Sequence, residues 1–227
     1  MCGIVGYVGE RDGVGILLEG LKRLEYRGYD SAGIAVLRDL HEVEMVRCQG
    51  KIASLERKLQ EQPLSGNTGI AHTRWATHGK PSDDNAHPHR SGPFVVVHNG
   101  IIENYSDLKA QLEEEGFAFS SETDTEVIVK LAEREWLAGK DYLQSVVDTL
   151  RQVRGSYAVV FLNAKHPQEL IAARKESPLI LGLGEGEYFV ASDVPAILPY
   201  TRNVVYLDDG DIVCISKDGY RIETLDG

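Results

Sequence analysis

The chain has 227 residues, and its 24 lysines and arginines against 35 aspartates and glutamates give a formal net charge of −11 at pH 7. This acidity disfavours nucleic acid and anionic membranes as partners, because both attract cationic surfaces. No apolar run approaches the roughly 20 residues of a membrane-spanning helix, and no secretory signal pattern is present, so we expect a cytoplasmic protein. Three cysteines without a CxxC pair exclude a disulfide framework.

Short runs rich in β-branched residues recur along the chain, bounded by glycine, aspartate or asparagine. They predict strands at 3–8, 33–37, 44–48, 94–98, 157–162, 170–174, 179–183, 188–191, 204–207, 211–216 and 220–223. Their close spacing favours antiparallel pairing, because a parallel crossover needs about a dozen residues or more. No repeat or flexible linker interrupts the sequence, so we expect one domain over residues 1–227.

Apolar residues at helical spacing predict a helix over 14–24, and similar stripes predict helices around 108–112, 127–131 and 143–150. The residues from Thr123 to Glu126 fit a capping box, with Thr123 as the N-cap and Glu126 as its partner. The helices come in blocks rather than after every strand. This order predicts an α+β fold.

Cys2 is the first residue with unusual chemistry, because it directly follows the initiator methionine. Removal of Met1 would leave a cysteine with a free α-amine, whose pKa near ~7.7–8.0 suits it to accept the proton of a thiol near ~8.5. Nucleophile and base would then belong to one residue. The alternative is that Cys2 is a small buried hydrophobe, which is how we interpret Cys48 and Cys214 inside their predicted strands.

Five of the seven histidines lie between His72 and His98, which raises the possibility of a zinc site. Against a metal, the segment has no HExxH motif, and its carboxylates Asp83 and Asp84 are adjacent rather than spaced as ligands. The sequence therefore favours a protein without a metal or other cofactor.

The same segment also suits an amino-acid ligand, which needs a cation for its carboxylate and an anion for its ammonium group. Arg27 and Arg74 are candidate cations and Asp124 is the candidate anion, although a solvated loop arginine and a helix-capping aspartate explain Arg74 and Asp124 equally well. Asn99-Gly100 reads most simply as a turn after the 94–98 strand. It could also form an oxyanion hole from a side-chain amide and an unhindered backbone N–H.

Several segments of the sequence together resemble the glutaminase domains of the glucosamine-6-phosphate synthase family, which are class II glutamine amidotransferases. The resemblance covers nearly the whole chain and rests on the segments 1–6, 24–33, 72–79, 85–89, 98–104 and 122–126, with later echoes at 177–179 and 191–193. It implies an N-terminal nucleophile hydrolase fold, a four-layer αββα sandwich of two antiparallel sheets with helices outside.

The resemblance also implies roles for individual residues. Cys2 looks like the nucleophile, with its own α-amine as the base, and Asn99 and Gly100 look like the oxyanion donors. Arg74 resembles the clamp for the carboxylate of glutamine, and Asp124 resembles the anchor for its ammonium group. The remaining candidates are similar to lid residues or to supporting residues near the nucleophile: Trp75, Thr77 and His78 in the lid, and Arg27 and His87 in support.

The resemblance implies a thioester intermediate and release of ammonia to a sugar isomerase domain. That domain would convert fructose 6-phosphate to glucosamine 6-phosphate, and the full-length enzyme is expected to be a homodimer. No isomerase segment occurs in residues 1–227, so the resemblance predicts glutamine hydrolysis by this chain. Three alternatives remain: the glutaminase domain of another class II amidotransferase, a metal-dependent hydrolase using the histidines, and a silent glutamine-binding domain.

Overall fold

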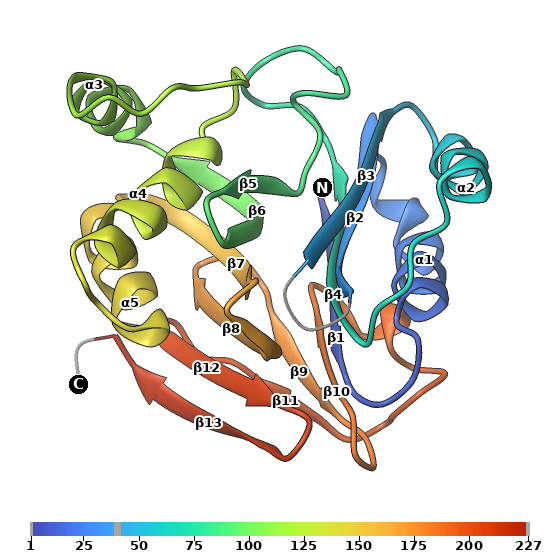
Figure 1. The fold of residues 1–227 in the computed structure, drawn as a ribbon. Coiled ribbons are helices and arrows are strands. Elements are labelled where there is room, and N and C mark those ends of the chain that lie inside the picture. Colours follow the sequence, from blue (N-terminus) through green and yellow to red (C-terminus); the bar gives the residue numbers. More distant parts are fainter. Residues whose placement is uncertain (1, 39–41, 226–227) are drawn as a thin grey trace.

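Two antiparallel sheets face each other in the computed structural model, which describes residues 2–38 and 42–225 (Figure 1). Within these residues, the first sheet has seven strands, in the spatial order β11 (Val204–Tyr206), β9 (Ile180–Leu183), β10 (Tyr188–Ala191), β1 (Gly3–Val8), β4 (Thr68–Arg74), β2 (Ser31–Arg38) and β3 (Glu42–Gln49). The second sheet has six, in the order β13 (Gly219–Thr224), β12 (Asp211–Ser216), β8 (His166–Lys175), β7 (Gly155–Asn163), β6 (Phe94–Ile102) and β5 (His89–Ser91).

Helices cover the outer face of each sheet, as Figure 1 shows. The first sheet carries α1 (Val14–Arg23) and α2 (Ile52–Glu61), and the second carries α3 (Tyr105–Glu114), α4 (Glu126–Leu137) and α5 (Tyr142–Gln152). Short 3-10 turns lie at Glu25–Arg27 and Val194–Ala196.

Three apolar cores separate the four layers. Alternate residues of the inner strands, among them Ile4 and Val97, fill the space between the sheets. The opposite residues, such as Val5 and Val96, pack beneath the helices. The layers are therefore helix, sheet, sheet and helix, which confirms the predicted α+β class and antiparallel pairing.

Each predicted strand and helix lies within or overlaps an observed element. Pattern analysis missed β4, β5 and α2. Strand β4 was missed because its second half, His72 to Arg74, is polar yet fully buried, so hydrophobicity gave no signal there. Helix α2 buries only Ile52 and Leu55 and otherwise reads as a charged surface segment.

Three local predictions were wrong. Asn99 and Gly100 are not a turn, because β6 continues through them to Ile102. Arg74 is not a loop residue, since it is the last residue of β4. Helix α4 begins at Glu126 with Thr125 as its N-cap, and the Glu126 carboxylate accepts hydrogen bonds from the backbone N–H groups of Ser120 and Ser121 rather than forming a box with Thr123.

The longest described helix, α4, has 12 residues. None of the helices in the described ranges is both long and apolar enough to cross a membrane.

Candidate active site

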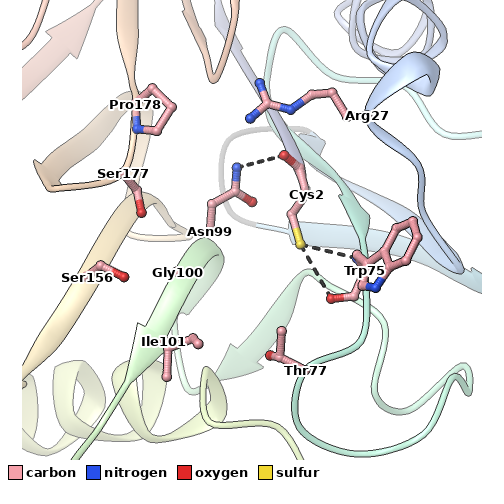
Figure 2. A pocket seen from close by; sticks show the side chains of 10 residues that line it. All are labelled: Cys2, Arg27, Trp75, Thr77, Asn99, Gly100, Ile101, Ser156, Ser177 and Pro178. Carbon is pink, nitrogen blue, oxygen red and sulfur yellow. Dashed lines mark hydrogen bonds between the residues drawn. The ribbon is translucent and has the colours of Figure 1, made fainter.

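Cys2 immediately precedes β1 and opens onto a cavity of about 590 Å³ at the end of the two sheets (Figure 2). Its sulfur accepts a hydrogen bond from the backbone N–H of Trp75, with an N–Sγ distance of 3.2 Å. Pairing of β1 with β4 sets Gly3 opposite Thr73, so strand register brings Cys2 beside the start of the loop that contains Trp75. The position of the thiol is thus determined by the sheet.

Burial raises the pKa of the Cys2 thiol above its ordinary value, and the hydrogen bond from the Trp75 N–H opposes this rise. A thiol with a raised pKa is mostly protonated at neutral pH. It therefore needs a base within reach before it can act as a nucleophile.

Asn99 reaches from β6 across to the first sheet, where its Nδ2 donates to the backbone carbonyl of Cys2 at 3.1 Å (Figure 2). Its Oδ1 lies 2.9 Å from Nε2 of His72. The next residue, Gly100, has a φ of 130°, and a Cβ there would lie 2.1 Å from the carbonyl oxygen of Ser156. Only glycine fits this position of the strand.

Arg74, His78 and Asp124 form a charged cluster next to the cavity. The guanidinium Nη2 donates to the carbonyl oxygens of His78 and Gly79, and Nη1 has no hydrogen-bond partner among the described residues although it is buried. Asp124 accepts a hydrogen bond from the Ile102 N–H at 2.8 Å, and its other oxygen lies 3.9 Å from Nδ1 of His78. A cation and an anion of the kind that bind an amino acid therefore lie on either side of His78.

Two side chains anchor the loops of this charged cluster. Asp30 accepts a hydrogen bond from the Ala76 N–H at 2.6 Å, which fixes the loop directly after Trp75. Asn85 connects two loops, because its Nδ2 donates to the Lys80 carbonyl and to the Glu122 carboxylate, and its Oδ1 accepts from the Glu122 N–H. The loop after Arg74 is thereby tied to the segment that carries Asp124.

The predicted site residues thus fall into three groups. Six line the cavity itself: Cys2, Arg27, Trp75, Thr77, Asn99 and Gly100. Arg74, His78 and Asp124 form the charged cluster beside it. His87 lies behind it, buried, with its ring stacked on that of His72 at a centroid separation of 4.1 Å.

Four residues that line the cavity were not predicted as site residues: Ile101, Ser156, Ser177 and Pro178. Ser177-Pro178 belongs to a segment that resembled the family, but no chemistry in those side chains indicated a role. The backbone N–H of Trp75 could not be predicted either, because a backbone donor leaves no trace in residue type.

The clustered histidines serve packing and hydrogen bonding in the structure. His98 bonds Thr125 through Nδ1 at 2.8 Å, and His89 bonds Thr123 through Nε2 at 3.0 Å. Within the ranges 2–38 and 42–225, no group of three or more histidine, cysteine, aspartate and glutamate side chains is arranged to hold a metal ion. The arrangement instead suits nucleophilic attack by sulfur beside amide donors.

Comparison with other proteins finds relatives in sequence and, separately, in fold. The chain is 52% identical over 217 residues to glutamine–fructose-6-phosphate aminotransferase (isomerizing) of Haemophilus influenzae, covering 96% of this chain and 36% of that protein. It is 53% identical to a protein of the same name from Thermus thermophilus, covering all of this chain and 37% of that protein. The chain thus spans little more than a third of the length of these relatives.

A solved structure of glutamine phosphoribosylpyrophosphate amidotransferase from B. subtilis superposes with a TM-score of 0.86 at 27% identity, covering 99% of this chain and 49% of that one. This likeness confirms the predicted N-terminal nucleophile hydrolase fold. A family model described as a glutamine amidotransferase domain matches residues 72–199, more than half of the chain. The chain belongs to the glutamine amidotransferase domain family.

Proposed function

We propose that this chain hydrolyses the side-chain amide of glutamine to glutamate and ammonia, with Cys2 as the nucleophile. One observation carries the proposal: the Cys2 sulfur, the Asn99 amide and Gly100 open onto one cavity in a glutamine amidotransferase domain. The cavity lies between Cys2 and Trp75 on one side and Ser156 and Ser177 on the other (Figure 2).

The reaction requires a free α-amine on Cys2, which removal of Met1 supplies. The amine takes the thiol proton, and the sulfur bonds to the amide carbon of glutamine. Asn99 Nδ2–H and the Gly100 N–H stabilise the oxyanion. The C–N bond then breaks, and the protonated amine delivers its proton to the departing ammonia. Water, activated by the same amine, cleaves the resulting thioester to glutamate and restores the thiol.

Recognition of glutamine falls to the charged cluster beside the cavity. Arg74 Nη1 is buried without a partner among the described residues, and it is the donor we assign to the α-carboxylate. Asp124 is the counter-charge for the α-ammonium group. Trp75, Thr77 and His78 belong to the loop that covers the ligand, while Arg27 supports the site from the cavity wall and His87 from behind it.

In the complete enzyme, the ammonia serves to aminate fructose 6-phosphate. The relatives named for that reaction are 52% and 53% identical to this chain, against 27% for the phosphoribosylpyrophosphate enzyme, which favours the sugar over other acceptors. Residues 1–227 are then the glutaminase domain, and a sugar isomerase domain accepts the ammonia in a cytoplasmic homodimer.

The test combines glutamate release with intact mass. Purified protein is incubated with glutamine, and separately with a glutamine-like electrophile such as 6-diazo-5-oxo-norleucine. We expect glutamate release, loss of Met1 and a single adduct on Cys2. The Cys2→Ala variant should release no glutamate and take up no adduct, while Cys214→Ala, which alters another half-buried thiol, should behave as wild type. Activity that survives in Cys2→Ala but disappears with a chelator would instead support a metal-dependent hydrolase.

A further inference from the structure

Asn99 is held by two hydrogen bonds that come from the opposite sheet. Its Nδ2 donates to the carbonyl oxygen of Cys2 at 3.1 Å, and its Oδ1 lies 2.9 Å from Nε2 of His72. His72 sits on β4 with its side chain in the space between the sheets, where it is completely buried. The steps proposed above use Asn99 as a donor but assign nothing to His72.

The carbonyl oxygen of Cys2 determines which way the Asn99 amide points. A carbonyl can only accept, so the amide nitrogen must face it. The amide oxygen then faces His72, and Nε2 of His72 must carry the proton and donate. The second N–H of the Asn99 amide remains available for a ligand in the cavity.

His72 is well suited to remain this donor. Burial lowers the pKa of His72 to about 3, so the ring is neutral at physiological pH and can keep its proton on Nε2. Its ring stacks on the His87 ring with an interplanar angle of 14°. His87 is fixed in turn, because its Nδ1 accepts the backbone N–H of His98 at 3.3 Å.

The packing around His87 leaves this stack little room to shift. Arg47 donates to the carbonyl oxygens of Ala86 and Pro88, on either side of His87. A Cβ on Gly33 would lie 2.2 Å from the His87 carbonyl oxygen, so the backbone at His87 packs closely against β2. The ring plane of His72 is therefore set by a rigid part of the fold.

We infer that His72 is a positioning residue for glutamine hydrolysis, holding the Asn99 carboxamide with its NH₂ group toward the nucleophile. Without this donor only the bond to the Cys2 carbonyl restrains the amide, so its NH₂ group is held less accurately toward the developing oxyanion. A misplaced donor stabilises the transition state less, whereas bound glutamine carries no full charge there. The inference rests on the proposed function, since it assigns a role within that reaction.

The test compares two substitutions at His72. His72→Leu removes the donor at similar size, and His72→Gln places an amide N–H at similar reach. We expect His72→Leu to lower kcat for glutamine roughly 10–100-fold with KM changed less than about threefold, within the loss of about 10²–10³ that one oxyanion donor accounts for. His72→Gln should recover most of kcat. If His72 only filled space, the His72→Gln variant would have no higher kcat than the His72→Leu variant.

A double-mutant cycle sharpens the test. In an Asn99→Ala background, where there is no amide to orient, His72→Leu should change kcat by less than about threefold. Alkylation of Cys2 by iodoacetamide passes through no oxyanion, so its rate should be the same in wild type and His72→Leu. Equal losses in both backgrounds, or unchanged kcat in His72→Leu, would overturn the inference. Should the leucine variant be insoluble, His72→Asn, which is polar but too short to bridge, takes its place.

The outcomes separate the two proposals. A wild-type protein that releases no glutamate, although its Cys2 reacts with iodoacetamide, would remove the proposed function. A wild-type protein that hydrolyses glutamine and whose His72→Leu variant hydrolyses it equally fast would remove only the role of His72.

Discussion

The two ends of the site are built in different ways. At the chemical end, Cys2, His72 and Asn99 lie on or next to strands of both sheets, and their bonds run across the space between the sheets. At the recognition end, Arg74 ends a strand, but the partners around it, His78 and Gly79, come from a loop. Side chains on strands are held more accurately than those on loops. In the proposed mechanism, the side chains that are held most accurately are therefore those that act on the transition state.

This comparison predicts the largest effect on turnover at the chemical end. Asn99→Ala should lower kcat by about 10²–10³-fold with a smaller change in KM, because the oxyanion exists only in the transition state. Steady-state kinetics of glutamate release measure both constants. Asn203→Ala, at an exposed asparagine outside the site, should change neither. A rise in KM at unchanged kcat would place Asn99 in recognition instead.

Arg74→Ala should act at the recognition end. Its proposed partner, the α-carboxylate, is charged in both the ground state and the transition state, so KM should rise while kcat changes little. Charge-assisted hydrogen bonds of about 1.5–3 kcal/mol correspond to a roughly 10–150-fold rise in KM. Arg57→Ala, on the exposed face of α2, is the matched control. A larger loss in kcat than in KM would abolish the distinction between the two ends.

Asn85→Ala sharpens the same comparison at a distance from the ligand. Loss of its bonds to Lys80 and Glu122 should loosen the loop after Arg74 against the segment that carries Asp124 and raise KM by about 3–10-fold, with kcat within twofold. The exposed Asn67→Ala serves as the control. Equal changes in kcat and KM would show that the loop also shapes the chemical end.

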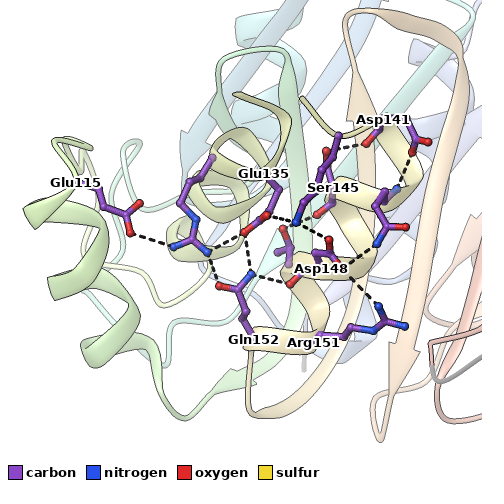
Figure 3. Close-up of polar contacts among 11 residues, drawn as sticks. Glu115, Glu135, Asp141, Ser145, Asp148, Arg151 and Gln152 are labelled. Atoms are coloured by element: carbon purple, nitrogen blue, oxygen red, sulfur yellow. Dashed lines mark hydrogen bonds and ion pairs between the residues drawn. The ribbon is translucent and has the colours of Figure 1, made fainter. Parts of the chain in front are cut away.

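A region remote from both ends should affect stability alone. Glu135 on α4 accepts hydrogen bonds from Lys140 at 2.6 Å, Arg134 at 2.8 Å and Gln152 at 3.0 Å, joining α4 to α5 (Figure 3). Burial by itself would raise the pKa of Glu135, but these bonds outweigh it and lower the pKa to about 2. A depressed pKa stabilises the fold above the ordinary value of 4.5, and this contribution is lost as the pH falls toward 2.

Glu135→Gln should therefore lower the free energy of unfolding by about 1–2 kcal/mol at pH 7, with kcat and KM unchanged. The difference from wild type should shrink as the pH is lowered from 4.5 toward 2, as followed by urea unfolding. Glu114→Gln, an exposed carboxylate on α3, should have no such effect. A difference that grows on acidification would contradict the sign of the pKa shift.

Sequence patterns predicted the layers but not how the site is assembled. The strands around Val5 and Val160 were visible because apolar, β-branched residues mark buried strands. Strand β4 was not, since His72, Thr73 and Arg74 are polar side chains buried for the site rather than for the core. Local rules failed most at functional positions, which is where natural sequences depart from them.

The same reasoning explains what could be said of individual residues. Cys2 was predicted as a site residue from its place beside Met1 together with the family resemblance, and Arg74, Asn99 and Asp124 from charge, amide chemistry and the same resemblance. The bond between His72 and Asn99 could not be predicted, because it joins strands of two sheets and depends on their register. The contact of Trp75 N–H with the sulfur is a backbone contact, which the identity of a side chain does not reveal.

The central claim is that the α-amine of Cys2 serves as the base for its own thiol, and N-terminal processing tests it most directly. Two preparations are compared for glutamate release: one with Met1 removed, verified by intact mass, and one with an uncleavable extension before Cys2. The account predicts hydrolysis by the processed protein and none above background by the extended one, with both still melting cooperatively. Full turnover by the extended protein would contradict it.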